Sequence, residues 1–542
     1  MNRQKNQWEI RMTVLLTVLC LLLLGLFSWF MATRGDSILT SDESSELVLA
    51  ELLHREHRII TTSWFYSSEL RLLNTQLVFA PLFAVFDDWG TVRIVGSTLL
   101  LAILALSALL FARAVKLGTV NALVCALLML VPFSGEYFSF VMVHSYYVPH
   151  ITISYVTMAA LFAASEKYSK GERRAAIWML DGFAAILGAV TCMGGIRQLL
   201  VLYFPLLLTG FIMLTAQLRR EYDGKRAPET ERSFVRHFFA GSTFITLFAG
   251  LGYVFNTAYL GERYLFASWN NIHFVSFSAE RFSNVLNGIA ASLGYRTGER
   301  VFSVGLLMNA AFLGFVVLLI AALIDSFQNH QTPVPERTLS IFFLAGLGLY
   351  TAVCTFTDFD LYDRYSLPIV VFAFSIVLMY IRRALTVKEQ RQWRALAAAG
   401  LVLFCLPHLL NYAMHRYCRP NPYQAVADTV LENGCRYGYS SFWNGNILTE
   451  LSDGQIEMHN WGIDISSVDD VNIASGWLQK TSHVNEIPVG PIFCLFSNSE
   501  RNTPLARQME GAEVIYETDQ FVVYRFSSYQ AMIEHIAVHR GG

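Results

Sequence analysis

Two adjacent carboxylates, Asp42 and Glu43, stand shortly after a long apolar run near the N-terminus. A carboxylate placed just outside a membrane can act as a general base for a reacting hydroxyl, or can orient a cation. The same stretch, "ILTSDESSELVLAELLHRE", also predicts a helix whose N-terminus is capped by Ser41, Asp42 and Glu43, because the helix dipole favours acidic residues there. Capping and catalysis are compatible, so both interpretations stay open.

A second group of polar residues lies a little further along, in "TTSWFYSSELRLLNTQLVFAPLF". Glu69 and Arg71 stand here among Trp, Phe and Tyr residues and next to a short apolar segment. This arrangement suits the lining of a binding site for a polar group near the membrane surface. The alternative is that the aromatic residues form an interfacial belt without any role in chemistry.

Three more ionisable residues occupy or flank the apolar segment "GEYFSFVMVHSYYVPH": Glu136, His144 and His150. An ionisable group inside a membrane segment is a candidate for function. A buried histidine whose hydrogen bonds are satisfied by a neighbour is the structural alternative. The pair His54 and His57 in "HREH" is explained by a solvated helix face more simply than by a metal.

The stretch "DLYDRYSLPIV" places Arg364 and Tyr365 at the start of a late apolar run. A guanidinium can clamp a phosphate with two hydrogen bonds, which an ammonium cannot do. It can equally anchor a helix end by snorkelling to the interface. Arg197 in "MGGIRQ" is expected on the same side of the membrane and is a weaker candidate for the same task.

The composition indicates a membrane protein that is mainly α-helical. Of the 542 residues, 54% are hydrophobic and 15% charged, and 40 basic residues stand against 42 acidic ones, which gives no indication of nucleic-acid binding. Runs near the roughly 20 residues that span a bilayer predict about eleven transmembrane helices. They lie near residues 11–33, 91–113, 118–134, 138–163, 175–195, 198–217, 236–258, 301–325, 338–356, 365–382 and 393–412.

The basic loops predict the orientation of these helices. Five basic stretches all fall on one side if these eleven runs cross, and the positive-inside rule makes that side cytoplasmic: "MNRQKNQWEIR", "ARAVKLG", "EKYSKGERR", "QLRREYDGKRAPETERSFVRH" and "IRRALTVKEQRQWR". We therefore expect a multi-pass plasma-membrane protein with a cytoplasmic N-terminus and large outer loops at 34–90 and 259–300. "NTQLVFAPLFAVF" is too short to cross and contains Pro81, so we expect an interfacial or re-entrant helix there.

From about residue 413 to 542 the composition becomes that of a soluble domain, which the orientation places outside the cytoplasm. "YQAVADTVLENG" predicts a helix that ends at Asn433-Gly434, with a strand after it. "AEVIYETDQFVVYRF" predicts two strands joined by a turn. We expect a transmembrane domain over 1–412 and a small α/β domain over 413–542. The odd number of cysteines in the second domain, Cys418, Cys435 and Cys494, leaves open whether two of them form a disulfide.

The "SDE" pair in the first outer loop, the later "DRYSLP", the many spans and the extracytoplasmic C-terminal domain together resemble the GT-C glycosyltransferases. The layout is similar to the protein O-mannosyltransferases and the lipid A aminoarabinose transferases, and "YGYSSFWNGNILTELSDG" resembles uncharacterised bacterial members. The C-terminal domain lacks a WWD-type motif, which argues against an oligosaccharyltransferase.

The resemblance implies an inverting transfer of a sugar from a polyprenyl-phosphate donor to an envelope glycan, lipid or protein on the outer face. Asp42 would be the base, with Glu43 as its supporting neighbour. The implied donor-phosphate ligands are Arg364, Tyr365 and Arg197, and the implied sugar-pocket residues are Glu69, Arg71, Glu136, His144 and His150.

Two other functional classes stay open: a lipid or polysaccharide transporter, and a non-catalytic protein that binds envelope glycans. A transporter should carry charges on midplane helices and internal repeats, whereas here the charges collect at the outer ends of the runs. The sequence leaves open which sugar is moved, which acceptor receives it and whether a divalent metal takes part.

Overall fold

The structure is a computed structural model that describes residues 2–266, 272–329, 331–359, 362–384, 400, 404–409, 420–461 and 475–539. The chain divides into two compact units. Unit 1 contains Met1–Leu26, Leu99–Ala258 and Trp269–His415, and unit 2 contains Phe27–Thr98, Tyr259–Ser268 and Arg416–Gly542. Helices α1 (Asn2–Arg34) and α4 (Trp89–Ala114) each run from one unit into the other.

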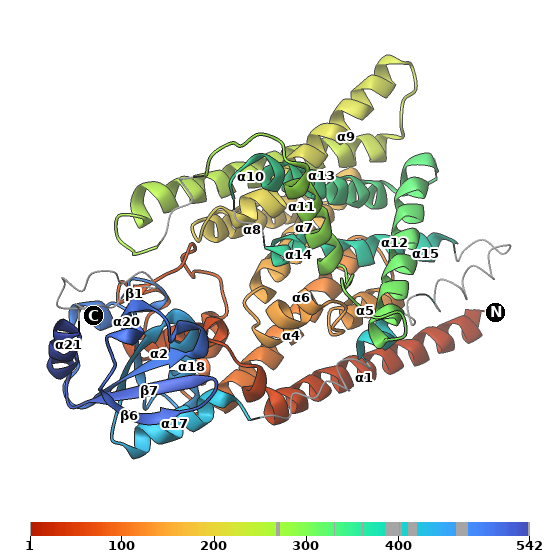
Figure 1. Cartoon of the computed structure of the whole chain (residues 1–542). Coiled ribbons are helices and arrows are strands. Elements are labelled where there is room, and N and C mark those ends of the chain that lie inside the picture. Colours follow the sequence, from red (N-terminus) through yellow and green to blue (C-terminus); the bar gives the residue numbers. More distant parts are fainter. Residues whose placement is uncertain are drawn as a thin grey trace. The chain divides into compact units, whose positions relative to one another are not determined.

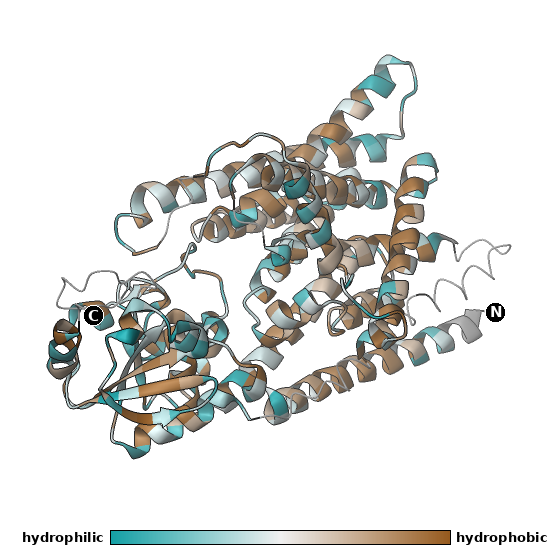
Figure 2. Ribbon diagram, in the orientation of Figure 1, coloured by the Kyte–Doolittle hydropathy of each residue, from teal (hydrophilic) through white to brown (hydrophobic). Residues whose placement is uncertain are grey.

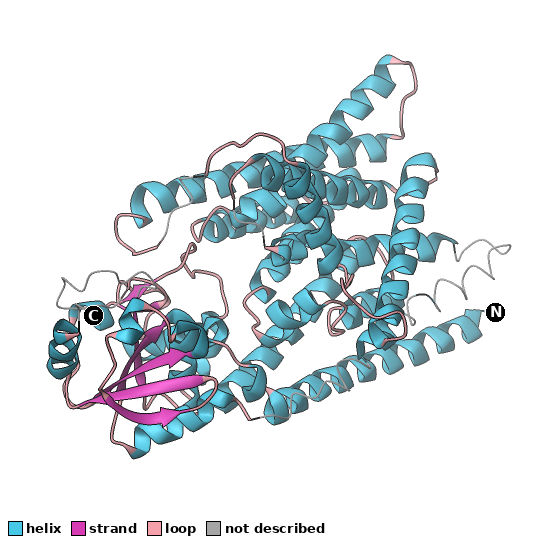
Figure 3. Ribbon diagram, in the orientation of Figure 1, coloured by secondary structure: helices cyan, strands magenta, loops and turns pink. Residues whose placement is uncertain are grey.

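Unit 1 is built from helices, and the strands of the chain belong to unit 2 in the described residues (Figures 1 and 3). Besides α1 and α4, its elements are α5 (Thr119–Leu128), α6 (Gly135–Tyr137), η2 (Phe138–Val143), α7 (Val148–Ser169), α8 (Arg174–Cys192), η3 (Leu199–Tyr203), α9 (Phe204–Tyr222), α10 (Glu229–Phe255), α11 (Ala279–Ser292), α12 (Val304–Gln328), α13 (Val334–Phe356), η5 (Asp363–Ser366), α14 (Leu367–Val370) and α15 (Phe372–Ala384).

The chain is a multi-pass membrane protein, as its apolar runs predict. In the described ranges, nine helices are long and apolar enough to cross a bilayer, and Figure 2 shows their hydrophobic colouring along most of their length. The expected count of about eleven is not confirmed. The run at 118–134 contains the ten-residue helix α5, and the run at 393–412 lies mostly outside the described residues.

The run at 138–163 also starts differently from the prediction. Its first part, η2, is a π-helix, and Ser145 after it has a left-handed φ of 63°. The spanning helix α7 therefore begins only at Val148, with Pro149 in its first turn, where a missing N–H costs nothing. This interruption places His144 and its neighbours in a connection between helices rather than on a straight helix.

Helices α7, α8 and α10 pack against one another, and a buried polar group joins all three. Ser165 of α7 lies 3.1 Å from Nδ1 of His237 in α10. Nε2 of the same imidazole lies 3.2 Å from Oδ2 of Asp181 in α8. Such interhelical contacts hold membrane helices together, because lipid offers no alternative hydrogen-bond partner.

The part of unit 2 that precedes α4 consists of short elements: η1 (Asp36–Ile38), α2 (Ser41–Glu56), β1 (Trp64–Phe65) and α3 (Gln76–Leu82). The seven-residue α3, with Pro81 inside it, is too short to cross a membrane, in agreement with the prediction. Helix α2 packs against α3 and against α18 (Phe442–Leu451) from the far end of the chain.

The C-terminal region of unit 2 forms a five-stranded sheet of order β3-β2-β5-β7-β6. Strands β3, β2 and β5 are parallel, and β7 joins β5 and β6 antiparallel. The strands are β2 (Tyr437–Ser441), β3 (Glu457–Trp461), β5 (Ile492–Ser497), β6 (Glu513–Glu517) and β7 (Phe521–Phe526). Around them lie α17 (Pro422–Glu432), α19 (Ser482–Asn485), η7 (Asn498–Glu500), α20 (Pro504–Arg507) and α21 (Tyr529–Val538), and β4 (Gln479–Lys480) pairs with β1.

Two local predictions for this region are confirmed. Helix α17 ends at Asn433, Gly434 follows with a positive φ of 71°, and β2 comes next. The pair β6 and β7 forms the expected antiparallel hairpin. Cys435 and Cys494 are free and buried, and Cys418 lies outside the described residues, so the described part shows no disulfide.

Glycine packing between α8 and α10 gives a test of this fold. A Cβ on Gly252 of α10 would meet the backbone of Ala189, with its Cα at 2.9 Å, whereas a Cβ on Gly250 would meet nothing within 4 Å. We expect Gly252→Ala to destabilise the protein by about 1–3 kcal/mol, because α8 and α10 must move apart. Thermal unfolding of the purified chain in detergent measures this, with Gly250→Ala as the matched control. Equal melting temperatures for the two variants would contradict the close packing.

Candidate active site

The first turn of α2 carries the two adjacent carboxylates. Its N-cap is Thr40, one residue before the expected Ser41, and Thr40 and Glu43 form a capping box. Oε1 of Glu43 accepts a hydrogen bond from the Thr40 amide at 2.6 Å, and Oε2 contacts the Thr40 hydroxyl. Glu43 is fully buried, whereas Asp42 is half-buried. Glu43 therefore has a structural task, and Asp42 is the carboxylate that a substrate could reach.

Burial also changes the acidity of Glu43. Desolvation raises the pKa of its carboxyl from 4.5 to about 7, against the opposing effects of the Thr40 hydrogen bond and the Arg93 charge. A carboxyl with such a pKa is partly protonated near neutral pH.

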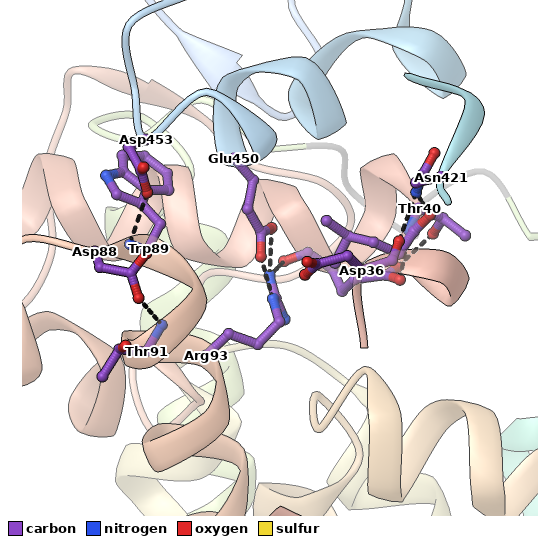
Figure 4. Close-up of polar contacts among 11 residues, drawn as sticks. Asp36, Thr40, Asp88, Trp89, Thr91, Arg93, Asn421, Glu450 and Asp453 are labelled. Carbon is purple, nitrogen blue, oxygen red and sulfur yellow. Dashed lines mark hydrogen bonds and ion pairs between the residues drawn. The ribbon is translucent and has the colours of Figure 1, made fainter. Parts of the chain in front are cut away.

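A buried ion pair lies directly behind this turn. Arg93, in the first part of α4, binds Glu450 of α18 through Nε and Nη2, with Nη2 2.6 Å from Oε2. Nη2 also donates to the backbone carbonyl of Glu43 at 3.0 Å. The two side chains are 4% and 5% exposed. Figure 4 shows this arrangement, in which the Arg93 guanidinium faces Glu450.

Other hydrogen bonds join the first loop to the C-terminal region within unit 2. Ser41 donates to the carbonyl of Trp443 at 3.0 Å, and the side-chain amide of Asn421 donates to the carbonyl of Asp36 at 2.7 Å. The Trp89 amide donates to Oδ1 of Asp453 at 2.9 Å, which Figure 4 also shows. The N-terminal turn of α2 is therefore held by segments from both ends of the chain.

Glu69 and Arg71 lie in the same unit, behind α2. Arg71 forms an ion pair of 2.8 Å with Glu46 of α2, and the hydroxyl of Thr75 donates to the same carboxylate at 2.6 Å. Glu69 is buried. These contacts give Arg71 a structural role, and the expected part of both residues in a sugar pocket stays a prediction.

The remaining candidate residues come together in unit 1. Nη1 of Arg197 donates to the Tyr147 hydroxyl at 3.1 Å and lies 3.5 Å from Nε2 of His150. The buried His150 is also contacted by Gln198, whose Nε2 lies 3.1 Å from Nδ1 of His150. The Arg197 guanidinium stacks on the Tyr365 ring at 5.0 Å from its centroid.

Arg364 occupies the neighbouring part of the same cluster. Its guanidinium lies 4.6 Å from the ring centroid of Phe140, 4.3 Å from that of Tyr362 and 5.8 Å from that of Tyr365. His144 packs edge-on against Phe140 at 5.3 Å. We call Phe140, His144, Tyr147, His150, Arg197, Arg364 and Tyr365 the arginine–aromatic cluster.

Glu136 borders this cluster. Burial and the nearby Asp363 raise the pKa of its carboxyl, and Arg364 opposes that shift. The electrostatic influence of both residues on Glu136 shows that the carboxyl lies close to η5. A group with a raised pKa beside a cation is a candidate for proton transfer or for binding a sugar hydroxyl.

Local backbone irregularity helps to form the arginine–aromatic cluster. Phe140 lies in the π-helix η2, His144 ends it, and the π-helix η3 begins directly after Gln198. Segments of this kind occur often at functional sites, because they redirect side chains out of the regular helix. The buried Ser145 has a positive φ, a conformation that non-glycine residues seldom adopt.

The structure thus brings the predicted site residues into two groups. Glu136, His144, His150, Arg197, Arg364 and Tyr365 gather in unit 1, and Asp42, Glu43, Glu69 and Arg71 lie in unit 2. Asp42, the predicted base, and Arg364, the predicted phosphate ligand, belong to different units, and their action on one substrate stays a prediction. Sequence reasoning missed Arg93 and Glu450. Arg93 could have been noticed, because a charged residue within the first turns of an apolar span is a candidate for function.

The described residues contain no group of three or more His, Cys, Asp or Glu side chains that could hold a metal ion. The chemistry derived below uses no step through one.

No protein-family model matches the sequence, and a search of curated proteins found no match. The solved structures that resemble the fold include two membrane proteins. ArnT from Cupriavidus metallidurans, bound to undecaprenyl phosphate, aligns over 94% of this chain and 97% of its own, with a TM-score of 0.56 and 10% identity. The Archaeoglobus fulgidus oligosaccharyltransferase, tethered with an acceptor peptide, aligns over 94% of this chain and 71% of its own, with a TM-score of 0.50 and 10% identity. The chain therefore shares the fold of these two membrane proteins, in agreement with the GT-C-like architecture that the sequence predicts.

The raised pKa of Glu43 predicts a pH dependence of stability. Between about pH 4.5 and 7 the unfolded carboxyl is ionised while the folded one keeps its proton, so the free energy of unfolding falls as the pH rises through this window. The loss amounts to about 3 kcal/mol for Glu43 alone. We expect Glu43→Gln to remove this part of the decrease, and thermal unfolding at pH 5 and pH 8 measures it. Parallel pH profiles for the two proteins would show that Glu43 is ionised in the fold.

Proposed function

We propose that this GT-C protein is an integral-membrane glycosyltransferase that moves a sugar from a polyprenyl-phosphate donor to an acceptor on the outer face of the membrane. The observation that carries the proposal is the likeness over nearly the whole of both chains to ArnT bound to undecaprenyl phosphate. The arginine–aromatic cluster supports it, because Arg197 and Arg364 supply two guanidinium groups suited to a phosphate.

In the proposed reaction, Asp42 takes the proton from an acceptor hydroxyl while the oxygen of that hydroxyl attacks the anomeric carbon of the donor sugar. The bond from that carbon to the phosphate oxygen breaks, and its electron pair remains on the leaving polyprenyl phosphate. Attack from the face opposite the phosphate inverts the anomeric configuration. Asp42 and the phosphate ligands must therefore face each other across the sugar.

The other residues have supporting parts in this proposal. Arg364, with Arg197 and Tyr365, stabilises the charge that grows on the leaving phosphate. Glu136, His144 and His150 stand where they could bind sugar hydroxyls or hold the arginines in place. Glu43 caps the helix that carries Asp42. The acceptor belongs to the envelope glycans, lipids or proteins.

We also propose that the N-terminus is cytoplasmic and that residues 413–542 lie outside. Within unit 1 one cavity of about 700 Å³ is lined by the ends of α4, α7 and α15 and the starts of α10 and α13, so these ends share one side. Its lining includes Lys116, Lys170, Arg382 and Arg383, and basic residues favour the cytoplasmic side.

Single cysteines introduced at exposed positions and labelled in intact cells would test this orientation. Labelling in the 218–235 loop with protection after residue 420 would reverse the orientation.

Replacement of Asp42 by Asn tests the assigned base. We expect sugar transfer to fall about 10²- to 10⁴-fold, because a general base contributes that much, while the protein keeps its donor lipid. Transfer is measured in membranes from cells that carry each variant, and bound polyprenyl phosphate by mass spectrometry of the purified protein. The control is Asp519→Asn, which changes an exposed turn of the same unit. Unchanged transfer in Asp42→Asn would remove Asp42 from the mechanism.

Replacement of Arg364 by Ala tests the assigned phosphate ligand. Loss of a charge-assisted hydrogen bond costs about 1.5–3 kcal/mol, so we expect much less polyprenyl phosphate to co-purify with this variant than with the wild type. Arg300→Ala, at an exposed position in the outer loop 259–300, is the matched control. If both variants retain the lipid equally, Arg364 does not bind the donor phosphate.

A further inference from the structure

Asp42 lies on a short helix in a loop between two spans, and a catalytic base must be held in a fixed direction. We infer that Arg93 and Glu450 are positioning residues, whose buried ion pair fixes the first turn of α2 and with it Asp42. This inference rests on the proposed role of Asp42. It makes the C-terminal α/β region a structural part of the active site, although that region carries no reacting group in the proposal.

The geometry supports the inference through one nitrogen atom. Nη2 of Arg93 donates both to Oε2 of Glu450 at 2.6 Å and to the backbone carbonyl of Glu43 at 3.0 Å. A guanidinium is a rigid planar fork. Glu450 binds both Nε and Nη2, which fixes the orientation of the guanidinium plane. The second N–H of Nη2 then has a fixed direction and points at the backbone carbonyl of Glu43, the residue after Asp42.

Burial makes this contact difficult to exchange for water. Arg93 and Glu450 are 4% and 5% exposed, and separating two buried charges leaves each without compensation. The pair Arg501 and Glu517 in the same unit is 28% and 58% exposed, and exposed pairs of that kind contribute little. The buried pair is therefore the one able to hold a helix turn.

Three further contacts act on this turn or on the residues just before it. Ser41, directly before Asp42, donates to the carbonyl of Trp443, and Asn421 donates to the carbonyl of Asp36, just before the helix. Ser45 donates to the carbonyl of Asp42 itself at 2.6 Å. Two of these three partners belong to the C-terminal region, as does Glu450. The capping box of α2 is formed by residues of the first loop alone. The direction of α2, in contrast, depends on contacts with residues beyond 420.

The test compares Arg93→Lys and Glu450→Gln with the control Glu517→Gln in the full-length protein. Lysine keeps the positive charge and loses the fork, whereas glutamine keeps the shape of Glu450 and loses its charge. Hydrogen exchange of the amides in residues 41–50 is measured by mass spectrometry. We expect exchange to become about tenfold faster in the two variants, because one charge-assisted hydrogen bond is weakened, and to stay unchanged in the control.

Sugar transfer and donor retention are measured on the same variants. We expect kcat to fall about 10²-fold with KM nearly unchanged, because a small misplacement of the base has that effect, and co-purified polyprenyl phosphate to stay at the wild-type level. Glu450→Gln keeps a neutral hydrogen-bonding group in the buried site, so it gives the answer if Arg93→Lys does not fold.

The outcomes separate the two proposals. Unchanged exchange in residues 41–50 of a folded variant would overturn the positioning role, whatever happens to transfer. Faster exchange with unchanged transfer would overturn the role of Asp42, and with it the catalytic meaning of the ion pair. Faster exchange with lower kcat and normal donor retention would support both.

Discussion

The ion pair between Arg93 and Glu450 is the interaction on which the first-loop site depends. A charge buried away from water is costly unless a partner and further hydrogen bonds compensate it, and this pair also holds the Glu43 carbonyl. Its two residues are 357 positions apart in the sequence. The first turn of α2 therefore cannot reach its final surroundings until the C-terminal region has formed. The short β1–β4 pairing, which joins Trp64 to Lys480, imposes the same order on the rest of the loop.

The two arginines of the arginine–aromatic cluster in unit 1 have a different kind of contact. Arg197 and Arg364 pack against the faces of aromatic rings, which attracts a cation without removing its charge. Stacking uses the flat face of a guanidinium, while its N–H groups point outward in the plane. This arrangement differs from the Arg93 clamp, where a carboxylate neutralises the charge in a buried setting.

The sequence predicted those features that depend on local pattern. Asn433-Gly434 ended α17 as expected, and β6 and β7 formed the predicted hairpin. Polar residues at the ends of apolar runs indicated five of the seven members of the arginine–aromatic cluster, all except Phe140 and Tyr147. The sequence could not predict the pairing of Arg93 with Glu450, because no local pattern connects an arginine at the start of a span with a glutamate in "ILTELSDG". The helices at 118–134 and 138–163 differed from the predicted continuous spans for a related reason. Pro132, Gly135 and the left-handed Ser145 interrupt runs that hydropathy alone presents as continuous.

The position of the polar residues along the spans bears on the choice between an enzyme and a transporter. A transporter presents polar groups near the bilayer midplane, where its substrate crosses. In this protein His144 and His150 stand at the start of α7, Arg197 stands between α8 and η3, and Arg364 stands in η5 before α15. Each of these places is the end of a membrane helix. A lipid phosphate lies at that depth, between the hydrocarbon that holds its tail and the water that holds its acceptor. The position of the cluster at helix ends therefore supports the proposed transfer from a lipid-linked sugar donor more than it supports transport across the membrane.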